Sequence, residues 1–337
     1  MLTAHPSRCR AAYGHVKMCR IRRGMDMPKI HLDTDIGGDM DDLCALALLL
    51  RWPGVEITGI TTTAEEHGRR AGYVRYVLDL TGRGDIPLAA GADLAEGYTR
   101  YESLGYPPED ENWPEPIAPQ SGPTDDAVEV LRHSIEHGAI IAAVGPYTNL
   151  MLLDRQYPGI LKQATVVLMG GYVYAPSAGF PQWSNEDDWN VQVDIQAAQH
   201  VMEQARPLLV PVSVTCQTAL RRSDLPRLAQ AGKLGDLLVR QAQVFDRTEG
   251  FAQKYGAVYA GLPDDLINFH HDPLACAIAL GWRDGVVIED FSLRLEVRDG
   301  WLHETPDPSG VPVRLVTEID AAAFNAFWCE MVGSASG

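Results

Sequence analysis

Five carboxylates lie within ten residues near the start of the chain, in the run Asp33-Thr34-Asp35-Ile36-Gly37-Gly38-Asp39-Met40-Asp41-Asp42. The run follows an apolar segment typical of a strand and precedes one typical of a helix. It therefore falls at the carboxyl edge of an α/β sheet, where ligands bind. Because five like charges repel one another unless a cation neutralises them, the run predicts a site for Ca²⁺ or Mg²⁺, which prefer carboxylate oxygens. Solvated loop acids, with Asp41 or Asp42 capping the helix, are the structural alternative.

Two other acidic loops resemble this run. An EF-hand is excluded, because the twelfth position counted from Asp33 is Cys44 and a strand precedes the loop. A Mg²⁺-dependent phosphohydrolase of the haloacid-dehalogenase type remains an alternative, with Asp33 as the nucleophile. Its Asp-x-Asp motif continues to Thr or Val at the fifth position, where this chain has Gly37.

Three further motifs carry polar side chains. The run His270-His271-Asp272-Pro273 places two histidines beside an Asp-Pro pair that starts a helix, so it predicts either a functional site or a helix cap. The run Asp188-Trp189-Asn190 suits binding of a polyol or the tying down of a loop. Residues 144–149, Val-Gly-Pro-Tyr-Thr-Asn, form a strand–turn–helix joint.

The elements that must position these motifs alternate along the chain. Short apolar runs predict strands at residues 29–35, 55–62, 86–90, 139–144, 165–169 and 207–214. Periodic runs predict helices at residues 42–51, 69–81, 125–137, 149–157, 194–204 and 273–280. This alternation predicts an α/β fold, a single Rossmann-like domain whose mostly parallel central sheet is flanked by helices.

The remaining segments complete the predicted organisation. We expect residues 98–123 to be a long surface loop and residues 172–189 to be a lid or binding loop. Alternating residues around Asp299-Gly300 predict a C-terminal β-hairpin within 291–318, and a last helix follows near 321–331. Residues 1–28 hold six basic side chains and one acidic one, without the apolar stretch of a secretory signal. We expect them to be a disordered leader before one domain at 29–331.

Composition narrows the class of protein. The 337 residues are 46% hydrophobic and carry a net charge of −17, so we expect a globular protein that repels nucleic acid. No apolar run is long enough for a membrane helix, which predicts a soluble protein with no membrane partner. Six scattered cysteines without a Cys-x-x-Cys pair predict reduced thiols and a cytoplasmic location.

Taken together, the motifs resemble the inosine–uridine-preferring nucleoside hydrolase family. The acidic opening and the late His-Asp-Pro occur in the family's order, and shorter matches cover most of residues 29–327. The matches include Gly59-Ile60-Thr61-Thr62, Met169-Gly170-Gly171, residues 85–91 and residues 313–317. The resemblance implies a Ca²⁺-dependent enzyme that hydrolyses the N-glycosidic bond of a small-molecule nucleoside to ribose and free base. It also implies a homodimer or homotetramer.

The resemblance also implies roles for individual residues. The implied metal ligands are Asp35, Asp42, Asp272 and the backbone carbonyl of Val144, and Asp35 is also the implied base. Ribose contacts are implied for Asp41, Met169, Asn190 and Asp188, where the family usually has Glu. His271 is the implied helper of the departing base, with His270 as the alternative.

Besides Asp188, two departures from the family bear on the candidate site residues. The family usually has one residue between the glycine and the paired acids, whereas this chain has Gly38-Asp39-Met40, so Asp39 is a rival of Asp41 for the ribose. The family commonly shows Gly-Asn where this chain has Glu65-Glu66, which makes Glu66 a candidate substrate contact. A non-catalytic ribose-binding relative is therefore another alternative, and the nucleobase stays undetermined.

Overall fold

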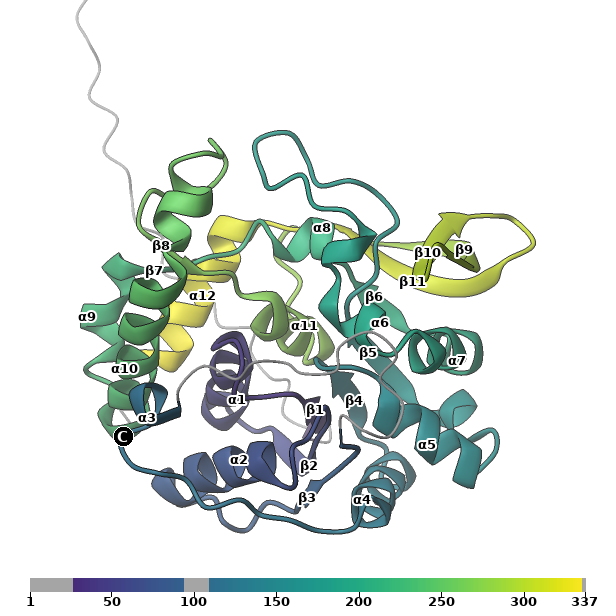
Figure 1. Cartoon of the computed structure of the whole chain (residues 1–337), viewed down its shortest axis with the longest axis horizontal. Coiled ribbons are helices and arrows are strands. Elements are labelled where there is room, and N and C mark those ends of the chain that lie inside the picture. Colours follow the sequence, from purple (N-terminus) through teal and green to yellow (C-terminus); the bar gives the residue numbers. More distant parts are fainter. Residues whose placement is uncertain (1–26, 94–108, 335–337) are drawn as a thin grey trace, which may run out of the picture.

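The computed structural model describes residues 27–93 and 109–334 of the chain. The predicted leader lies almost wholly outside the described residues, and the predicted loop at 98–123 lies partly outside them. The described chain forms a nine-stranded sheet in the order β10-β9-β11-β6-β5-β4-β1-β2-β3 (Figure 1). Its strands are β1 Lys29–Thr34, β2 Glu56–Thr62, β3 Leu88–Ala90, β4 Ile140–Ala143, β5 Thr165–Met169, β6 Leu208–Val210, β9 Val287–Arg298, β10 Trp301–Pro306 and β11 Val311–Glu318.

The strands from β3 to β11 pair in parallel, and β9 and β10 add an antiparallel edge. The order β3-β2-β1-β4-β5-β6 reverses its direction between β1 and β4, which are hydrogen-bonded neighbours. In open α/β sheets this switch point is where ligands bind, because the loops after the two strands diverge and leave a crevice. The acidic run follows β1 and Val144 follows β4, so the topology brings both to this crevice.

Helices cover both faces of the sheet (Figure 1). One hydrophobic cluster joins the strands to α1, α2, α10, α11 and α12, and a second joins them to α4, α5 and α7. The helices are α1 Asp41–Arg51, α2 Arg69–Leu80, α3 Glu109–Asn112, α4 Thr124–Glu136, α5 Thr148–Gln156, α6 Trp189–Val193, α7 Ile195–Ala205, α8 Val212–Thr215, α9 Leu225–Leu228, α10 Gly232–Glu249, α11 His271–Ala279 and α12 Ala321–Val332. The predicted α/β class, with its mostly parallel sheet and C-terminal hairpin, is confirmed.

Some element boundaries differ from the sequence prediction. The strand expected at 207–214 ends at Val210, and Pro211 begins the turn into α8, because proline cannot donate the ladder hydrogen bond of a central strand. The expected C-terminal hairpin gains a third strand, because β11 pairs with β9 as well as with β6. The sequence prediction missed α10, an 18-residue helix, and the small β7–β8 sheet formed by Leu220–Arg221 and Leu266–Asn268.

Two further findings concern the described residues only. None of the helices in residues 27–93 and 109–334 is both long and apolar enough to span a bilayer. Cys44, Cys216, Cys276 and Cys329 are free thiols, and the first three are buried, as predicted.

Candidate active site

Three carboxylates converge at the carboxyl edge of the sheet. Asp41 and Asp42 open helix α1, and Asp272 lies in the first turn of helix α11. One oxygen from each carboxylate lies within 4.8 Å of the other two, and all three side chains are buried. Residues 230 positions apart in sequence therefore form one compact acidic cluster.

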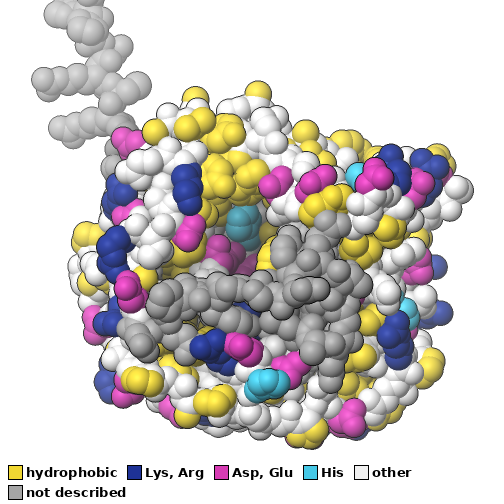
Figure 2. Space-filling model, viewed as in Figure 1, with side chains coloured by type: hydrophobic (Ala, Val, Ile, Leu, Met, Phe, Trp, Pro, Cys, Tyr) yellow, Lys and Arg dark blue, Asp and Glu magenta, His cyan; other side chains and the backbone are white. Residues whose placement is uncertain are grey.

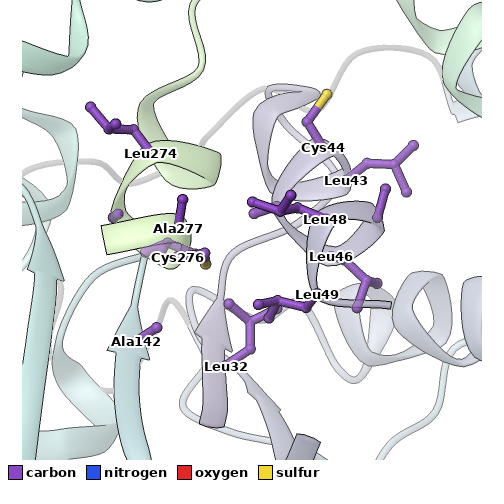
Figure 3. Packing of buried hydrophobic residues seen from close by; sticks show 14 of the residues in the cluster. Leu32, Leu43, Cys44, Leu46, Leu48, Leu49, Ala142, Leu274, Cys276 and Ala277 are labelled. Atoms are coloured by element: carbon purple, nitrogen blue, oxygen red, sulfur yellow. The ribbon is translucent and has the colours of Figure 1, made fainter. Parts of the chain in front are cut away.

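The packing of α1 against α11 holds this cluster together. Both helices are apolar over most of their length and belong to the same hydrophobic cluster. Figure 3 shows Leu48 of α1 on the side that faces Cys276 and Ala277 of α11, with Leu32 of β1 and Ala142 of β4 nearby. The close carboxylates all belong to first turns, so the N-termini of the two helices lie together. The positive end of each helix dipole stabilises negative charge there.

The three acids form an electrostatically unfavourable set. Burial raises the pKa of Asp41, Asp42 and Asp272 well above the ordinary value, and the charges of neighbouring carboxylates raise it further. Few hydrogen bonds offset this cost: Thr34 donates to Asp42, and the backbone N–H of Asp272 donates to Asp41 over 3.3 Å. Buried carboxylates with oxygens to spare fit a hard divalent cation, which would neutralise the repulsion.

Asp35 lies beside the cluster, at the end of β1. Its Oδ2 accepts a hydrogen bond of 3.1 Å from Nε1 of Trp189, and a Cβ on Gly145 would lie 2.8 Å from its Oδ1. Burial raises the pKa of Asp35, while the positive charge of Arg70 opposes this shift. Arg70 donates to the backbone carbonyls of Asp35 and Ile36, so it fixes the turn that aims this carboxylate.

The inserted Asp39 has a different environment. Its Oδ1 accepts from the N–H groups of Met40 at 2.5 Å and Asp41 at 3.4 Å, and from the side-chain amide of Asn268. Burial raises its pKa to about 6. Asp39 therefore ties the start of α1 to β8, and it lies outside the three-carboxylate cluster.

The turn after β4 faces the loop that ends in Asp188-Trp189-Asn190. The side-chain N–H₂ of Asn190 donates to the Val144 carbonyl at 2.7 Å and to the Met169 carbonyl at 3.1 Å. Tyr147 donates its hydroxyl to the same Met169 carbonyl over 2.8 Å. One amide thus binds the ends of β4 and β5 together, and it brings Val144, Met169 and Asn190 to one place.

Asp188 is buried at the N-terminus of α6. Its Oδ2 accepts from the N–H of Gly171 at 2.5 Å, and its Oδ1 accepts from the N–H of Val191 at 3.3 Å. Burial raises the pKa of Asp188 to about 7. This carboxylate caps the helix and lies next to Gly170, whose Cβ would come within 3.2 Å of Oδ1.

His271 adjoins the acidic cluster through its neighbour Asp272. Its Nδ1 forms a 2.7 Å hydrogen bond with the hydroxyl of Thr215. Trp183 and Phe269 contact the ring at centroid distances of 5.9 and 5.3 Å. Burial lowers the pKa of His271 to about 4, so the ring is neutral at pH 7. The ring of His270 packs against Trp328, with a centroid distance of 4.3 Å and the two rings tilted by 43°.

The two glutamates after β2 differ in burial and in their partners. Glu65 is buried and accepts from the hydroxyl of Thr62 and from the N–H groups of Arg70 and Ala71 at the start of α2. Glu66 is exposed and pairs with Arg69 over 2.5 Å. The structure therefore does not bring Glu66 together with the buried site residues, and it makes Glu65 an anchor of helix α2.

The site lies at the bottom of a hollow. Figure 2 shows this hollow, with acidic and histidine side chains on its floor and hydrophobic side chains along its upper rim. Sequence reasoning missed Arg70, Asn268 and Thr215, which orient the predicted residues. No motif marks these three, because each acts through a contact that only the fold creates.

A Rossmann-like sheet with a buried carboxylate cluster at its switch point places the chain among α/β proteins, a class whose members bind ligands at the carboxyl edge of the sheet. The family model described as inosine-uridine preferring nucleoside hydrolase matches residues 30–326, and the chain belongs to this family. It is a hydrolase that acts on N-glycosyl bonds of ribonucleosides, as the motifs predicted.

Known proteins resemble the chain in sequence and in fold. A pyrimidine-specific ribonucleoside hydrolase, RihA, of Salmonella paratyphi C is 31% identical over 271 residues, which cover 76% of this chain and 79% of that protein. A plant nucleoside hydrolase superposes with a TM-score of 0.71 at 18% identity, over 91% of this chain and 99% of the other. A purine-preferring ribonucleoside hydrolase from Gardnerella vaginalis has a TM-score of 0.73 at 20% identity, over 90% and 98%.

Proposed function

We propose that the chain hydrolyses a ribonucleoside to ribose and free base in a Ca²⁺-dependent reaction. The observation that carries this proposal is the buried cluster of Asp41, Asp42 and Asp272, with Asp35 beside it at the switch point of the sheet. A set of anionic oxygens in a dry site stabilises the positive charge that develops on the ribose when the bond to the base breaks.

The proposed metal ligands are the carboxylates of Asp35, Asp42 and Asp272 and the carbonyl of Val144. A carbonyl oxygen has two lone pairs, so the hydrogen bond from Asn190 leaves one of them for a cation. When bound, Ca²⁺ would supply positive charge that acidifies a water molecule and orients the sugar hydroxyls. The raised pKa values of the acids support a cation in this place.

The proposed ribose contacts are Asp41, Met169, Asp188 and Asn190. Asp41 is favoured over Asp39, because the Oδ1 atom of Asp39 already accepts three hydrogen bonds whereas Asp41 lies within the acidic cluster. Asn190 holds the Met169 carbonyl beside that of Val144, one of the proposed metal ligands. Ribose offers hydroxyls that both donate and accept, so carboxylates and an amide suit it.

In the proposed reaction, Asp35 accepts a proton from the water that attacks C1′ of the ribose. The bond between C1′ and the base nitrogen breaks, and its electron pair leaves with the base. The neutral ring of His271 donates a hydrogen bond to the leaving base, and the protonated ring would donate a proton to it. Its ring is held by Thr215 through Nδ1, and Nε2 has no partner in the described part of the chain. Nε2 is therefore the atom available to the base.

The structure supports neither of the other functions. The phosphohydrolase alternative needs Asp33 as an accessible nucleophile, but Asp33 is fully buried and accepts hydrogen bonds from Thr61 and Asn149. The non-catalytic alternative was motivated by Glu65-Glu66, and these residues are an anchor of α2 and an exposed ion pair.

Ribose release from a panel of purine and pyrimidine nucleosides tests the proposal. We expect release with Ca²⁺ present, loss after exhaustive chelation and recovery when Ca²⁺ is restored. Full activity in the chelated protein would refute the metal dependence. Ribose binding without turnover of any nucleoside would support the non-catalytic alternative, and an aspartyl-phosphate trapped with a fluoride analogue would support the phosphohydrolase.

Two further proposals remain: family resemblance carries a homodimer or homotetramer, and the free thiols carry a cytoplasmic location. Light scattering on the purified chain tests the first. The nucleobase preference comes from the same panel, because the relatives named above differ in theirs.

A further inference from the structure

A second buried carboxylate, that of Glu304 in the C-terminal part of the chain, binds the same turn as Asp188. Glu304 belongs to strand β10 of the C-terminal sheet edge, and only 3% of its surface is exposed. Its Oε2 accepts a 2.9 Å hydrogen bond from the N–H of Tyr172. Its Oε1 is buried and has no hydrogen-bond partner in the described part of the chain.

Asp188 and Glu304 bind consecutive amides of one turn. Gly171 donates its N–H to Asp188 over 2.5 Å, and the next residue, Tyr172, donates to Glu304. Gly170 and Gly171 both have positive φ, 138° and 102°, which favours glycine. A Cβ on Gly170 would lie 3.2 Å from Asp188 Oδ1, and a Cβ on Gly171 would lie 3.7 Å from Glu304 Oε1. The bare turn therefore leaves room for both carboxylates.

In the part of the chain that the structure describes, no positively charged side chain acts on this pair. The basic side chains of the adjacent strand β9, Arg294 and Arg298, are exposed and pair with Asp307 and Glu296. Two acids lie on the neighbouring helices. Asp194 at the N-terminus of α7 accepts a hydrogen bond from the hydroxyl of Thr148, and Asp187 accepts one from the backbone N–H of Ser184. The charges of Asp188 and Glu304 both act on the hydroxyl of Tyr147, which donates its hydrogen bond to the Met169 carbonyl. Among these described neighbours, the charge that acts on Glu304 is that of Asp188.

Two carboxylates in one dry site resist carrying two negative charges, so one of them keeps a proton. Hydrogen bonds decide which one. Asp188 accepts from two backbone N–H groups and lies at a helix N-terminus, whereas Glu304 accepts from one. In agreement with this ordering, burial raises the pKa of Asp188 to about 7, and burial and the Asp188 charge raise that of Glu304 to about 8.

We propose that Glu304 is a positioning residue that holds the proton of the Asp188–Glu304 pair, so that Asp188 keeps the single negative charge offered to a sugar hydroxyl. The inference rests on the proposed function only in assigning Asp188 to the ribose. It assigns the C-terminal sheet edge a part in substrate binding, through the turn that carries Gly171 and Tyr172.

The proton on Glu304 determines how the stability of the folded chain changes with pH. A carboxyl whose folded pKa is raised above its unfolded value binds a proton in the folded state that the unfolded chain releases. Its contribution to stability is therefore lost as pH rises from about 4.5, the unfolded value, to about 8. Glu304→Gln imitates the neutral acid and removes this loss.

The test compares the unfolding equilibrium of the wild-type chain and Glu304→Gln from pH 5 to pH 9. We expect the unfolding constant of the wild type to rise relative to that of the variant by up to about tenfold per pH unit within that window. Glu296→Gln, an exposed carboxylate on β9, is the matched control and should keep the wild-type slope. Parallel curves for wild type and Glu304→Gln would overturn the proposal.

A second readout separates positioning from a structural role. We expect the KM of the wild type for its nucleoside to rise above pH 8 with little change in kcat, and Glu304→Gln to keep a flat KM. A pH-independent rise of KM in the variant would overturn the positioning role. If Glu304→Gln does not fold, Asp188→Asn removes the other carboxylate of the pair. The unfolding constant of this variant should then change less with pH than that of the wild type, and an unchanged pH dependence would refute the proposed proton sharing.

The unfolding measurement needs no substrate. A wild-type chain that releases no ribose but shows the expected difference in unfolding slopes would refute the proposed function and leave the proton-sharing pair standing. Nucleoside hydrolysis together with parallel unfolding curves would support the proposed function and refute the proton-sharing pair.

Discussion

Asp35 is the residue on which the proposed chemistry depends most directly, because it lies beside the acidic cluster and its Oδ2 accepts a hydrogen bond from the N–H of Trp189. Asp35→Asn keeps the shape of the side chain and removes the proton acceptor. We expect kcat to fall by about 10²–10⁴. The measurement is ribose release at saturating nucleoside, with the unfolding midpoint as a check on folding.

Asp39→Asn is the matched control for this prediction, because Asp39 belongs to the same run but binds Asn268 and the start of α1. We expect it to retain kcat within about tenfold of the wild type, which is below the range of a lost general base. A larger loss of kcat in Asp39→Asn than in Asp35→Asn would mean that Asp39, and not Asp35, is the proton acceptor.

His271→Ala tests help to the leaving base. A general acid matters most when the leaving group is poor, so we expect nucleosides to slow by about 10²–10⁴ and a nitrophenyl riboside to slow far less. Comparing kcat/KM for the two substrates measures this. Equal slowing of both would assign His271 to positioning alone, consistent with its packing against Trp183 and Phe269.

At the scale of the elements, Glu65 shows how one side chain secures a helix that carries a site residue. Its carboxylate accepts from the N–H groups of Arg70 and Ala71, two of the donors that a helix N-terminus leaves without partners. Arg70 in turn holds the carbonyls of the turn at Asp35. The glutamate that replaces the family's usual residue therefore supports the acidic run from outside.

We expect Glu65→Ala to lower the free energy of unfolding by about 1–3 kcal/mol, because buried donors lose their acceptor. Glu66→Ala, in which only an exposed ion pair is lost, should change it by less than about 1 kcal/mol. Urea denaturation of both variants checks the pair. A larger effect at Glu66 would show that the exposed carboxylate has a contact beyond Arg69.

At the scale of the whole molecule, the acidic cluster couples metal binding to stability. Without a cation, the raised pKa values of Asp41, Asp42 and Asp272 mean that the folded chain binds protons that the unfolded chain releases. Stability from these groups is then lost as pH rises above the ordinary aspartate value near 4. A bound cation stabilises the ionised form and removes this loss.

We therefore expect Ca²⁺ at a hundredfold excess over its dissociation constant to raise the free energy of unfolding at pH 7.5 by about 2.7 kcal/mol. Thermal unfolding in a Ca²⁺ titration measures this, and Asp272→Asn should lose most of the effect. An identical unfolding temperature in chelator and in Ca²⁺ would contradict a metal site in the cluster. A larger shift with Mg²⁺ would assign a different ion.

Local sequence determined a large part of this protein. Hydrophobic periodicity marked the parallel strands and the helices between them, because burial on both faces of a sheet demands continuous apolar runs. Types and spacing of residues marked the acidic run and the late His271-Asp272, because crowded carboxylates need neutralising wherever they lie. The sequence prediction overlooked α10, although its buried residues Leu234, Leu237, Leu238 and Gln241 recur at helical spacing.

Only the tertiary structure decided which of these residues meet. Glu65 and Glu66 are adjacent and identical in type, yet the start of α2 buries one and leaves the other in solvent. Asp41 and Asp272 share a site because α1 packs on α11, and no local pattern encodes that contact. Glu304 binds the turn beside Asp188 from 132 positions away, through a sheet edge whose register is set by long-range pairing. Side-chain types are local properties of a sequence, whereas burial and the distance between charges follow only from the packed chain.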